Sequence, residues 1–357
     1  TGSWAATLQK AQKENKLIFV DTYFTGCHPC AQMDKDVFPN EMVSKELQDN
    51  FIGIKVDVFK EKLGDTINMK YGISGFPTFL ILEKNGKLIS MFSGYNDPGR
   101  LLLELNDAKQ KAVGKQFLSG FAATYTDYPA FYKRYYDREA RKVDPAAASA
   151  WILEQKDWTK EQVALPLLRM NKLGLEIDEY FIKKYAAYRN MYGKLLVFDK
   201  ASGVLSARMR TAVDKQKNEA AFRQFLDANS KSFPAEDWKI FRFLLGFEYY
   251  GGIAKDTVSL LQFINEEPVA YMNYLGSLYN NMLVKKQLDQ TTLNLLCNWV
   301  NKTVTIESPI DIIRVAASLH KQNNDKEGYR RFVNMALEKS RKYRMPTEGF
   351  EKMLASE

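Results

Sequence analysis

The chain has 357 residues, of which 45% are hydrophobic and 13% aromatic, and this composition is typical of a folded globular protein with room for two or three domains. No run approaches the roughly 18 uncharged apolar residues of a membrane span, so we expect no membrane span in this chain. The net charge of +8 is uneven, because residues 1–107 carry 12 Lys and Arg against 14 Asp and Glu, whereas the remainder carries 39 against 29. The positive charges are scattered, and we therefore expect no nucleic-acid partner.

The first predicted elements surround a pair of cysteines. The apolar run 17–24 predicts a strand, the segment Cys27-His28-Pro29-Cys30 follows it after a short turn, and residues 31–36 favour a helix. This order is typical of a thioredoxin-like redox motif rather than of a metal site. Cys27 is expected at the N-terminus of the helix, where free backbone N–H groups and the helix dipole lower the pKa of a thiol below roughly 8.5.

The elements that follow strengthen the resemblance. Residues 55–58 predict a strand, residues 71–82 lead through Phe76-Pro77 into another, residues 85–87 form a hairpin turn and residues 88–92 a further strand. Asp97-Pro98 then starts a helix as N-cap and first helical residue. Residues 4–105 together resemble a thioredoxin-fold domain, of the branch seen in bacterial secreted thioredoxin-like and thiol:disulfide interchange proteins. The resemblance implies an α/β thioredoxin fold, with a central mixed sheet flanked by helices.

The two cysteines are the candidate redox pair. Cys27 is expected to be the exposed nucleophile and Cys30 the more buried resolving thiol, because exchange needs one thiol to attack and a second to resolve the mixed disulfide. A purely structural disulfide is the alternative, although a two-residue loop constrains the unfolded chain little. A zinc site needs four ligands, and the chain offers only His28 and His320 besides its cysteines. We therefore expect no metal and no cofactor other than the redox-active disulfide.

The residues between the cysteines are expected to tune the reduction potential. A charged His28 would favour the thiolate and make the disulfide more oxidising. A proline before the second cysteine, as at Pro29, resembles the pattern of the reducing thioredoxins. The two residues therefore favour opposite reduction potentials, and the direction of electron flow stays open. His28 as a solvated turn residue is an equal alternative.

Asp21 lies six residues before Cys27, at the position of the buried acid that thioredoxins use for proton transfer with the resolving cysteine. Burial in the predicted strand would raise the pKa of its carboxyl and suit it to proton transfer near neutral pH. An exposed aspartate at the strand end, without a role, is the alternative.

The resemblance also implies a substrate-binding loop. Phe76-Pro77 matches the family's cis-proline loop, where the backbone of Phe76 would pair with an extended substrate; an ordinary trans proline is the alternative. Gly26 stands where most thioredoxins carry tryptophan, which removes an aromatic wall of the usual substrate groove. Tyr23 and Phe24 are candidates to replace that wall.

From about residue 109 the strand pattern gives way to helix starts. Asp144-Pro145 and Ser308-Pro309 read as an N-cap with a first-turn proline, and residues 159–162 have capping-box form. Residues 309–341 predict a helix pair with a polar turn. We expect a thioredoxin-like domain over residues 1–108 and an all-helical domain of stacked hairpins over residues 109–357, with a repeat left open. Cys297, in an apolar helical stretch, is expected to be a buried, inert thiol.

These observations predict a thiol:disulfide oxidoreductase that acts on protein thiols or disulfides and is served by an unidentified redox partner. Whether it is a reductase, an oxidase or an isomerase stays open. The resemblance implies a periplasmic or otherwise extracytoplasmic bacterial location; no signal peptide is seen in this sequence, and a cytoplasmic location is left open. The alternative function is a helical protein-binding module carried on a thioredoxin scaffold, with little or no redox turnover.

Overall fold

The computed structural model describes residues 3–124, 126–137, 139, 143–213, 218–270 and 288–355. Contacts between residues divide the chain into two compact units. The first unit comprises residues 1–95 and 102–205, and the second comprises residues 96–101 and 206–357. The domain boundary expected at residues 108 and 109 stays a prediction, because compactness alone does not test whether a segment folds independently.

A four-stranded mixed sheet forms the centre of the first unit, as the sequence predicts. Its order is β2-β1-β3-β4; β1 and β2 are parallel, and β3 is antiparallel to both β1 and β4. The strands span β1 (Leu17–Tyr23), β2 (Phe51–Asp57), β3 (Thr78–Leu82) and β4 (Leu88–Ser93). All five residues of β3 are buried, and the four from Phe79 to Leu82 are apolar, as expected for a central strand that is covered on both faces.

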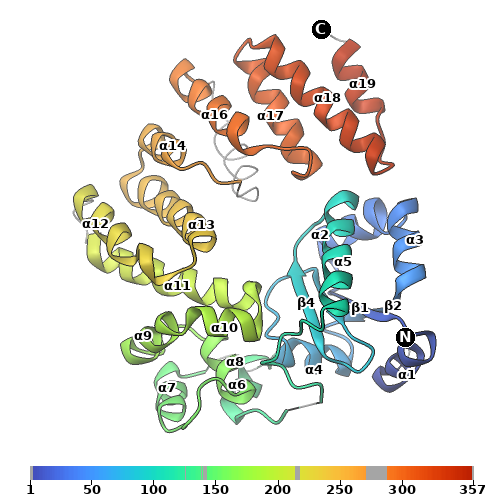
Figure 1. Ribbon diagram of the computed structural model, residues 1–357. Coiled ribbons are helices and arrows are strands. Elements are labelled where there is room, and N and C mark those ends of the chain that lie inside the picture. The colour runs from blue at the N-terminus through green and yellow to red at the C-terminus, as the bar shows by residue number, and fades with distance from the viewer. Residues whose placement is uncertain are drawn as a thin grey trace. The chain divides into compact units, whose positions relative to one another are not determined.

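Helices cover both faces of this sheet. They are α1 (Trp4–Glu14), α2 (His28–Gln32), a π-helical turn (Met33–Val37), α3 (Glu41–Asn50), α4 (Lys62–Lys70) and α5 (Pro98–Val113). Figure 1 shows α3 and α5 on one side of the sheet and α4 on the other. Asn40 ends the active-site helical region and caps α3, because its side chain accepts hydrogen bonds from the N–H groups of Met42 and Val43.

Further helices complete the first unit. They are α6 (Ala130–Tyr135), α7 (Pro145–Leu153), α8 (Glu161–Arg169), α9 (Leu175–Lys183), α10 (Tyr185–Tyr192) and the first part of α11 (Lys194–Val213). Asp144 caps α7 as expected, with its carboxylate accepting from the N–H of Ala146. The capping box expected at Thr159 is wrong, since α8 starts two residues later and Thr159 instead donates to Asp157.

Glu161, the first residue of α8, contacts α4, one of the helices that cover the sheet. Its buried carboxylate accepts a hydrogen bond from the Lys70 ammonium of α4 at 3.0 Å, from the backbone N–H of Ala122 at 2.6 Å and from the Tyr128 hydroxyl. The Lys70 side chain is equally buried. The glutamate therefore points inward to neutralise Lys70 instead of serving its own helix terminus.

The second unit is helical in the part that the structure describes. It contains the end of α11 and the helices α12 (Glu219–Asn229), α13 (Ala235–Gly246), a π-helix (Phe247–Ala254), α14 (Thr257–Glu266), α16 (Gln290–Thr303), α17 (Ile310–Gln322), α18 (Lys326–Lys342) and α19 (Glu348–Ala355), besides a 3-10 turn (Ser230–Ser232). An all-helical domain of stacked hairpins is expected after the sheet; a mostly helical region of many helices is confirmed, and the stacking of hairpins stays a prediction. The predicted helix pair corresponds to α17 and α18, joined by the turn at residues 323–325.

Asp97 belongs to this second unit although it precedes α5. One carboxylate oxygen accepts from the N–H of Arg100, which makes Asp97 the expected cap of α5. The other accepts from the N–H of Ile310 at 2.8 Å, at the start of α17. Ser308, the cap expected there, does not serve α17; its hydroxyl accepts from the N–H of Thr305. A residue 213 positions away thus does what a local serine was expected to do.

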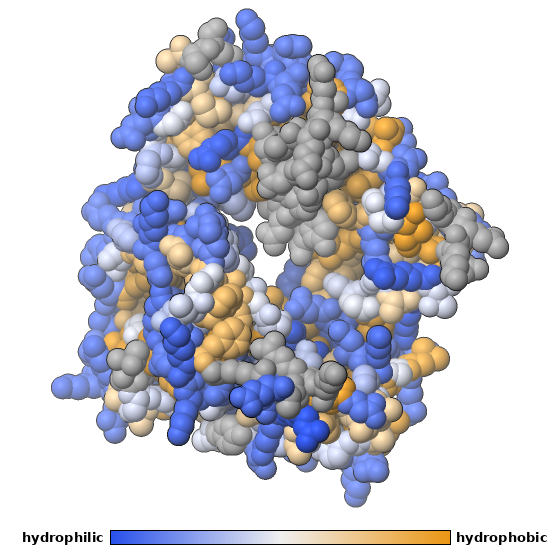
Figure 2. Space-filling model, turned by 180° about the vertical axis from the view of Figure 1, so that it is seen from behind, coloured by the Kyte–Doolittle hydropathy of each residue, from blue (hydrophilic) through white to orange (hydrophobic). Residues whose placement is uncertain are grey.

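Figure 2 shows hydrophilic residues over most of the face that it displays, with apolar side chains between them. The large apolar side chains that are exposed, among the described residues, are Leu103, Val113, Leu153 and Leu175, which lie on three different helices. None of the described helices combines the length and the apolar character needed to cross a bilayer.

Candidate active site

Cys27 and Cys30 form a disulfide at the start of α2, with their Cα atoms 5.3 Å apart. Cys27 is the N-cap residue, and the backbone N–H of Cys30 donates a hydrogen bond to its sulfur at 3.3 Å. A thiolate formed at Cys27 on reduction would keep this donor and the positive end of the helix, both of which stabilise an anion. The expected difference in exposure is absent in the disulfide form, because each cysteine is only 4% exposed.

Gly26, directly before Cys27, has open space beside its backbone. Gly26 has a φ of +97°, a backbone conformation that favours glycine, and a Cβ placed there would meet no atom within 4 Å. The backbone conformation therefore explains why no tryptophan occupies this position. His28 is exposed. Both roles expected for His28 and Pro29 in tuning the potential stay predictions.

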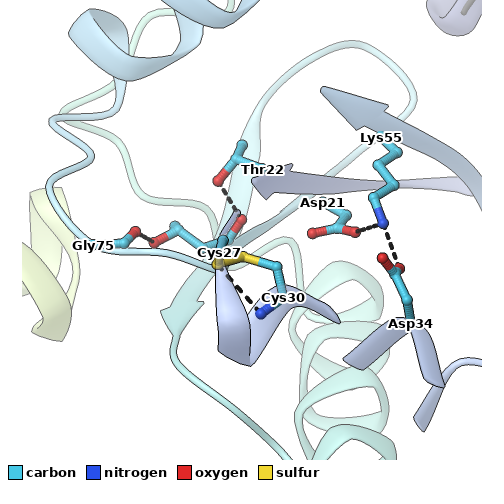
Figure 3. Close-up of a disulfide and its surroundings, with 8 residues drawn as sticks. Asp21, Thr22, Cys27, Cys30, Asp34, Lys55 and Gly75 are labelled. Carbon is cyan, nitrogen blue, oxygen red and sulfur yellow. Dashed lines mark hydrogen bonds and ion pairs between the residues drawn. A yellow bond between two sulfur atoms is a disulfide. The ribbon is translucent and has the colours of Figure 1, made fainter. Parts of the chain in front are cut away.

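Asp21 lies in the middle of the sheet, paired in register with Lys55 of β2 and Phe79 of β3. It is 6% exposed, and one of its carboxylate oxygens has no hydrogen-bond partner among the described residues. The other lies 3.6 Å from the Lys55 ammonium, which also contacts Asp34 (Figure 3). Burial raises the pKa of Asp21 from 3.8 to about 6, against the opposing effect of Lys55. The burial expected for this residue is present, whereas its role in proton transfer stays a prediction.

The Phe76–Pro77 peptide bond is cis, as the resemblance implies. Hydrogen bonds lie on both sides of it: the Thr22 hydroxyl donates to the carbonyl of Thr78, after the cis bond, at 2.6 Å, and the Thr78 hydroxyl donates to the carbonyl of Gly75, before it, at 2.7 Å. Among the described residues, neither the N–H nor the C=O of Phe76 has a backbone partner. This short stretch of backbone is therefore available to another chain.

Three half-buried phenylalanines form a cluster beside this loop. The ring centroids of Phe24 and Phe59 and those of Phe24 and Phe76 are 5.5 Å apart, and those of Phe59 and Phe76 are 6.0 Å apart. We call these residues the phenylalanine cluster. Tyr23, expected to share this surface, has instead the Lys55 ammonium 4.7 Å from the centre of its ring.

Phe59 is not among the site residues predicted from the sequence. A signal was available, because β1 and β2 are parallel and the residues after both strands meet at the same edge of the sheet. Asp57 fixes this edge: its carboxylate accepts from the Thr25 hydroxyl at 2.8 Å and from the N–H of Phe59 at 3.0 Å. Burial raises the pKa of the Asp57 carboxyl, but the hydrogen bonds that it accepts lower the pKa, and the net shift is downward.

The third cysteine has a different environment. Cys297 on α16 is buried, and burial raises the pKa of its thiol to about 11, in agreement with an inert thiol. In the part of the chain that the structure describes, no group of three or more His, Cys, Asp or Glu side chains is placed to hold a metal ion. That the protein works without a cofactor stays a prediction.

Comparison with known proteins identifies the first part of the chain. Residues 4–109 match the model of the thioredoxin-like domain family. Thioredoxin-1 of Drosophila melanogaster is 30% identical over 84 residues, which cover 24% of this chain and 72% of that protein. The chain belongs to the thioredoxin-like family.

Other relatives of this thioredoxin-like domain are parts of longer proteins. An uncharacterised protein of Caenorhabditis elegans is 38% identical over 79 residues, or 21% of this chain, and human spermatogenesis-associated protein 20 is 42% identical over 48 residues, or 13% of this chain. The aligned residues are 11% of the worm protein and 6% of the human one. The thioredoxin-like domain and its C-x-x-C pair support thiol–disulfide chemistry at the general level of an oxidoreductase.

Proposed function

We propose that this protein exchanges disulfides with protein substrates, with Cys27 as the attacking thiol and Cys30 as the resolving thiol. The observation that carries the proposal is the hydrogen bond from the Cys30 N–H to the Cys27 sulfur at the start of α2. It gives Cys27 a donor that favours the thiolate, the reactive form of cysteine, and no described residue provides one for the Cys30 sulfur.

The reaction balances without a cofactor. In the reducing direction, the Cys27 thiolate attacks one sulfur of a substrate disulfide and releases the other as a thiolate, which gives a mixed disulfide. The Cys30 thiol then loses its proton and attacks the Cys27 sulfur, which releases the second substrate thiolate and forms the Cys27–Cys30 disulfide. The substrate gains two electrons and the protein loses two; the oxidising direction is the reverse.

Asp21 is the proposed acceptor of the Cys30 proton. It is buried, one of its oxygens is unpartnered among the described residues, and its pKa of about 6 lies closer to neutral pH than that of an ordinary aspartate. A base whose pKa lies near the working pH is both deprotonated and able to accept a proton.

The substrate class follows from the loop beside the disulfide. We infer an extended protein segment that pairs with the Phe76 backbone, which has no backbone partner in the described part of the chain. The segment would place an apolar side chain next to its cysteine against the phenylalanine cluster. Thiols or disulfides of proteins, rather than small disulfides, are therefore the proposed substrates. The redox partner and the extracytoplasmic location stay predictions.

The test traps the mixed disulfide on a defined substrate. A synthetic peptide disulfide with phenylalanine beside one cysteine is mixed with the reduced Cys30→Ser variant, and a covalent peptide adduct on Cys27 is expected by mass spectrometry. Cys27→Ser should give no adduct, and Cys297→Ser serves as the control that exchanges like the wild type. An adduct on Cys30 or Cys297 would contradict the assignment.

The reduction potential of the pair then gives the direction. A value near about −270 mV indicates a reductase, and one of about −120 to −180 mV an oxidant or isomerase. If the wild-type protein neither forms the adduct nor turns over the peptide, the alternative hypothesis of a helical protein-binding module is favoured.

A further inference from the structure

Lys55 is shared between two carboxylates. Its ammonium lies 3.6 Å from Asp21, which is its register partner on β1, and it makes a much closer ion pair with Asp34 (Figure 3). Asp21 is buried, whereas Lys55 and Asp34 are partly exposed. The cation opposite the buried acid is thus held mainly by a second, outer acid.

Asp34 occupies an irregular part of the active-site helix. The π-helical turn Met33–Val37 directly follows α2, and it keeps Met33 and Val37 buried while Asp34 faces outward. Single π-turns are uncommon and often occur at functional sites. This turn brings an acidic side chain from the cysteine-bearing helix to the lysine of the neighbouring strand.

Two charged side chains of the described residues act on Asp21. Lys55 faces it from β2 and Asp34 from the π-turn; the register partner on β3 is the apolar Phe79, and α2 contributes the disulfide, which does not titrate. An ammonium close to a carboxylate favours its charged form, and a second carboxylate disfavours it. Asp34 acts on Asp21 in two ways, by repulsion and by drawing the Lys55 ammonium to itself.

We propose that Asp34 is a positioning residue for the disulfide exchange proposed above: by holding the Lys55 ammonium, it leaves the Asp21 carboxyl able to accept the proton of Cys30. The inference rests on that proposed function. It gives a role to a residue that does not touch the disulfide and that the sequence analysis did not single out.

The first experiment measures Asp21 directly in the oxidised protein, where no thiol titrates. The carboxyl carbon of Asp21 is followed by NMR from pH 3 to 9 in the wild type and in Asp34→Asn. Removing Asp34 should release Lys55 toward Asp21 and lower the titration midpoint by roughly half a unit to one unit. The matched control is Asp36→Asn, which removes the same charge from an exposed position of the same π-turn. Equal shifts in the two variants would overturn the proposal.

A second variant separates holding from repulsion. If Asp34 acts through Lys55, the effect of Asp34→Asn should shrink to less than half in a Lys55→Met background, because no ammonium remains to be released. An undiminished shift would mean that Asp34 acts by repulsion alone, and the positioning role would be wrong.

The reduced protein supplies the functional measurement. The rate at which Cys30 resolves a mixed disulfide should rise with pH through the Asp21 titration, and in Asp34→Asn this limb should move to lower pH by the shift seen in NMR. If the limb stays in place while the NMR midpoint moves, the positioning role fails but exchange stands. If no variant exchanges disulfides, the proposed function fails while the coupling of Asp34, Lys55 and Asp21 can still be measured.

Discussion

Asp97 and Lys339 form an ion pair at 3.2 Å in which neither side chain is exposed to solvent. The same ammonium donates to the carbonyl of Ser308 at 2.9 Å, and the same carboxylate caps both α5 and α17. A buried ion pair adds little net stability, but removing one partner leaves an uncompensated charge inside the protein. This cluster therefore makes the second unit sensitive to a single substitution.

Asp97→Asn should destabilise the second unit by about 3–5 kcal/mol, because it strands the Lys339 ammonium and replaces one hydrogen-bond acceptor by a donor. The measurement is the urea midpoint of unfolding. Asp311→Asn is the control, since Asp311 is exposed and pairs with the exposed Arg314; its effect should stay within about 1 kcal/mol. Similar midpoints for both variants would contradict the prediction.

Asp21→Asn should stabilise the protein at neutral pH. The pKa of Asp21 is raised from 3.8 to about 6 in the folded state, so the fold disfavours the carboxylate. The resulting loss of folding stability is absent below the pKa of the unfolded state. It grows as the pH rises through the unfolded and then the folded pKa, and above about pH 6 it amounts to about 3 kcal/mol. Unfolding measured at pH 4 and pH 8 should show the gain only at the higher pH. A gain equal at both pH values, or a loss at pH 8, would rule out burial of the charge as the cause.

Phe59→Ala should change which substrates are used rather than whether exchange occurs. Removing one ring of the phenylalanine cluster takes away apolar contact area, so kcat/KM for a peptide disulfide flanked by phenylalanine should fall about fivefold to tenfold. The rate with a small disulfide should stay unchanged. Phe117→Ala, at a half-buried position on the loop after α5, is the control. Equal losses on both substrates would indicate a structural defect instead.

Glu161→Gln should destabilise the first unit by about 3–5 kcal/mol, because the buried Lys70 loses its counter-charge. Glu179→Gln, on the exposed face of α9, should change stability by less than about 0.5 kcal/mol. Thermal unfolding of the two variants, followed by circular dichroism, would test this difference. A Glu161 variant as stable as the Glu179 variant would show that Lys70 finds another way to be neutralised.

The local features of the fold could be predicted from the sequence because neighbours along the chain determine them. Strand β1, the helix after Cys27 and the cap at Asp144 each depend on a few adjacent residues. Two caps were wrong for the opposite reason. Thr159 and Ser308 have the right side chains, but Asp157 binds the first, and Asp97 supplies the cap of α17 from a distant part of the chain.

The site divides in the same way. The cysteine pair and the cis proline belong to a motif whose spacing is visible in sequence, and Asp21 lies at a fixed distance from it. Phe59 and Asp34 cannot be found from such a motif. Phe59 is brought to the site by the parallel pairing of β1 with β2, and Asp34 by the π-helical turn after α2. The direction of electron transfer depends on the reduction potential of the pair relative to that of its partner, which residue identities do not convey.

The Lys70–Glu161 contact has a consequence for how this protein can be divided. The lysine lies inside the segment shared with the thioredoxin-like family, at residues 4–109, whereas the glutamate lies beyond it. A thioredoxin-like segment cut at residue 109, or transplanted into another protein at that point, would lose both acceptors of the Lys70 ammonium, the Glu161 carboxylate and the Thr124 carbonyl. The segment that matches the family is therefore shorter than the segment that contains both Lys70 and its counter-charge. A graft that continues through helix α8 keeps both acceptors, and it should therefore be more stable than a graft made at the family boundary.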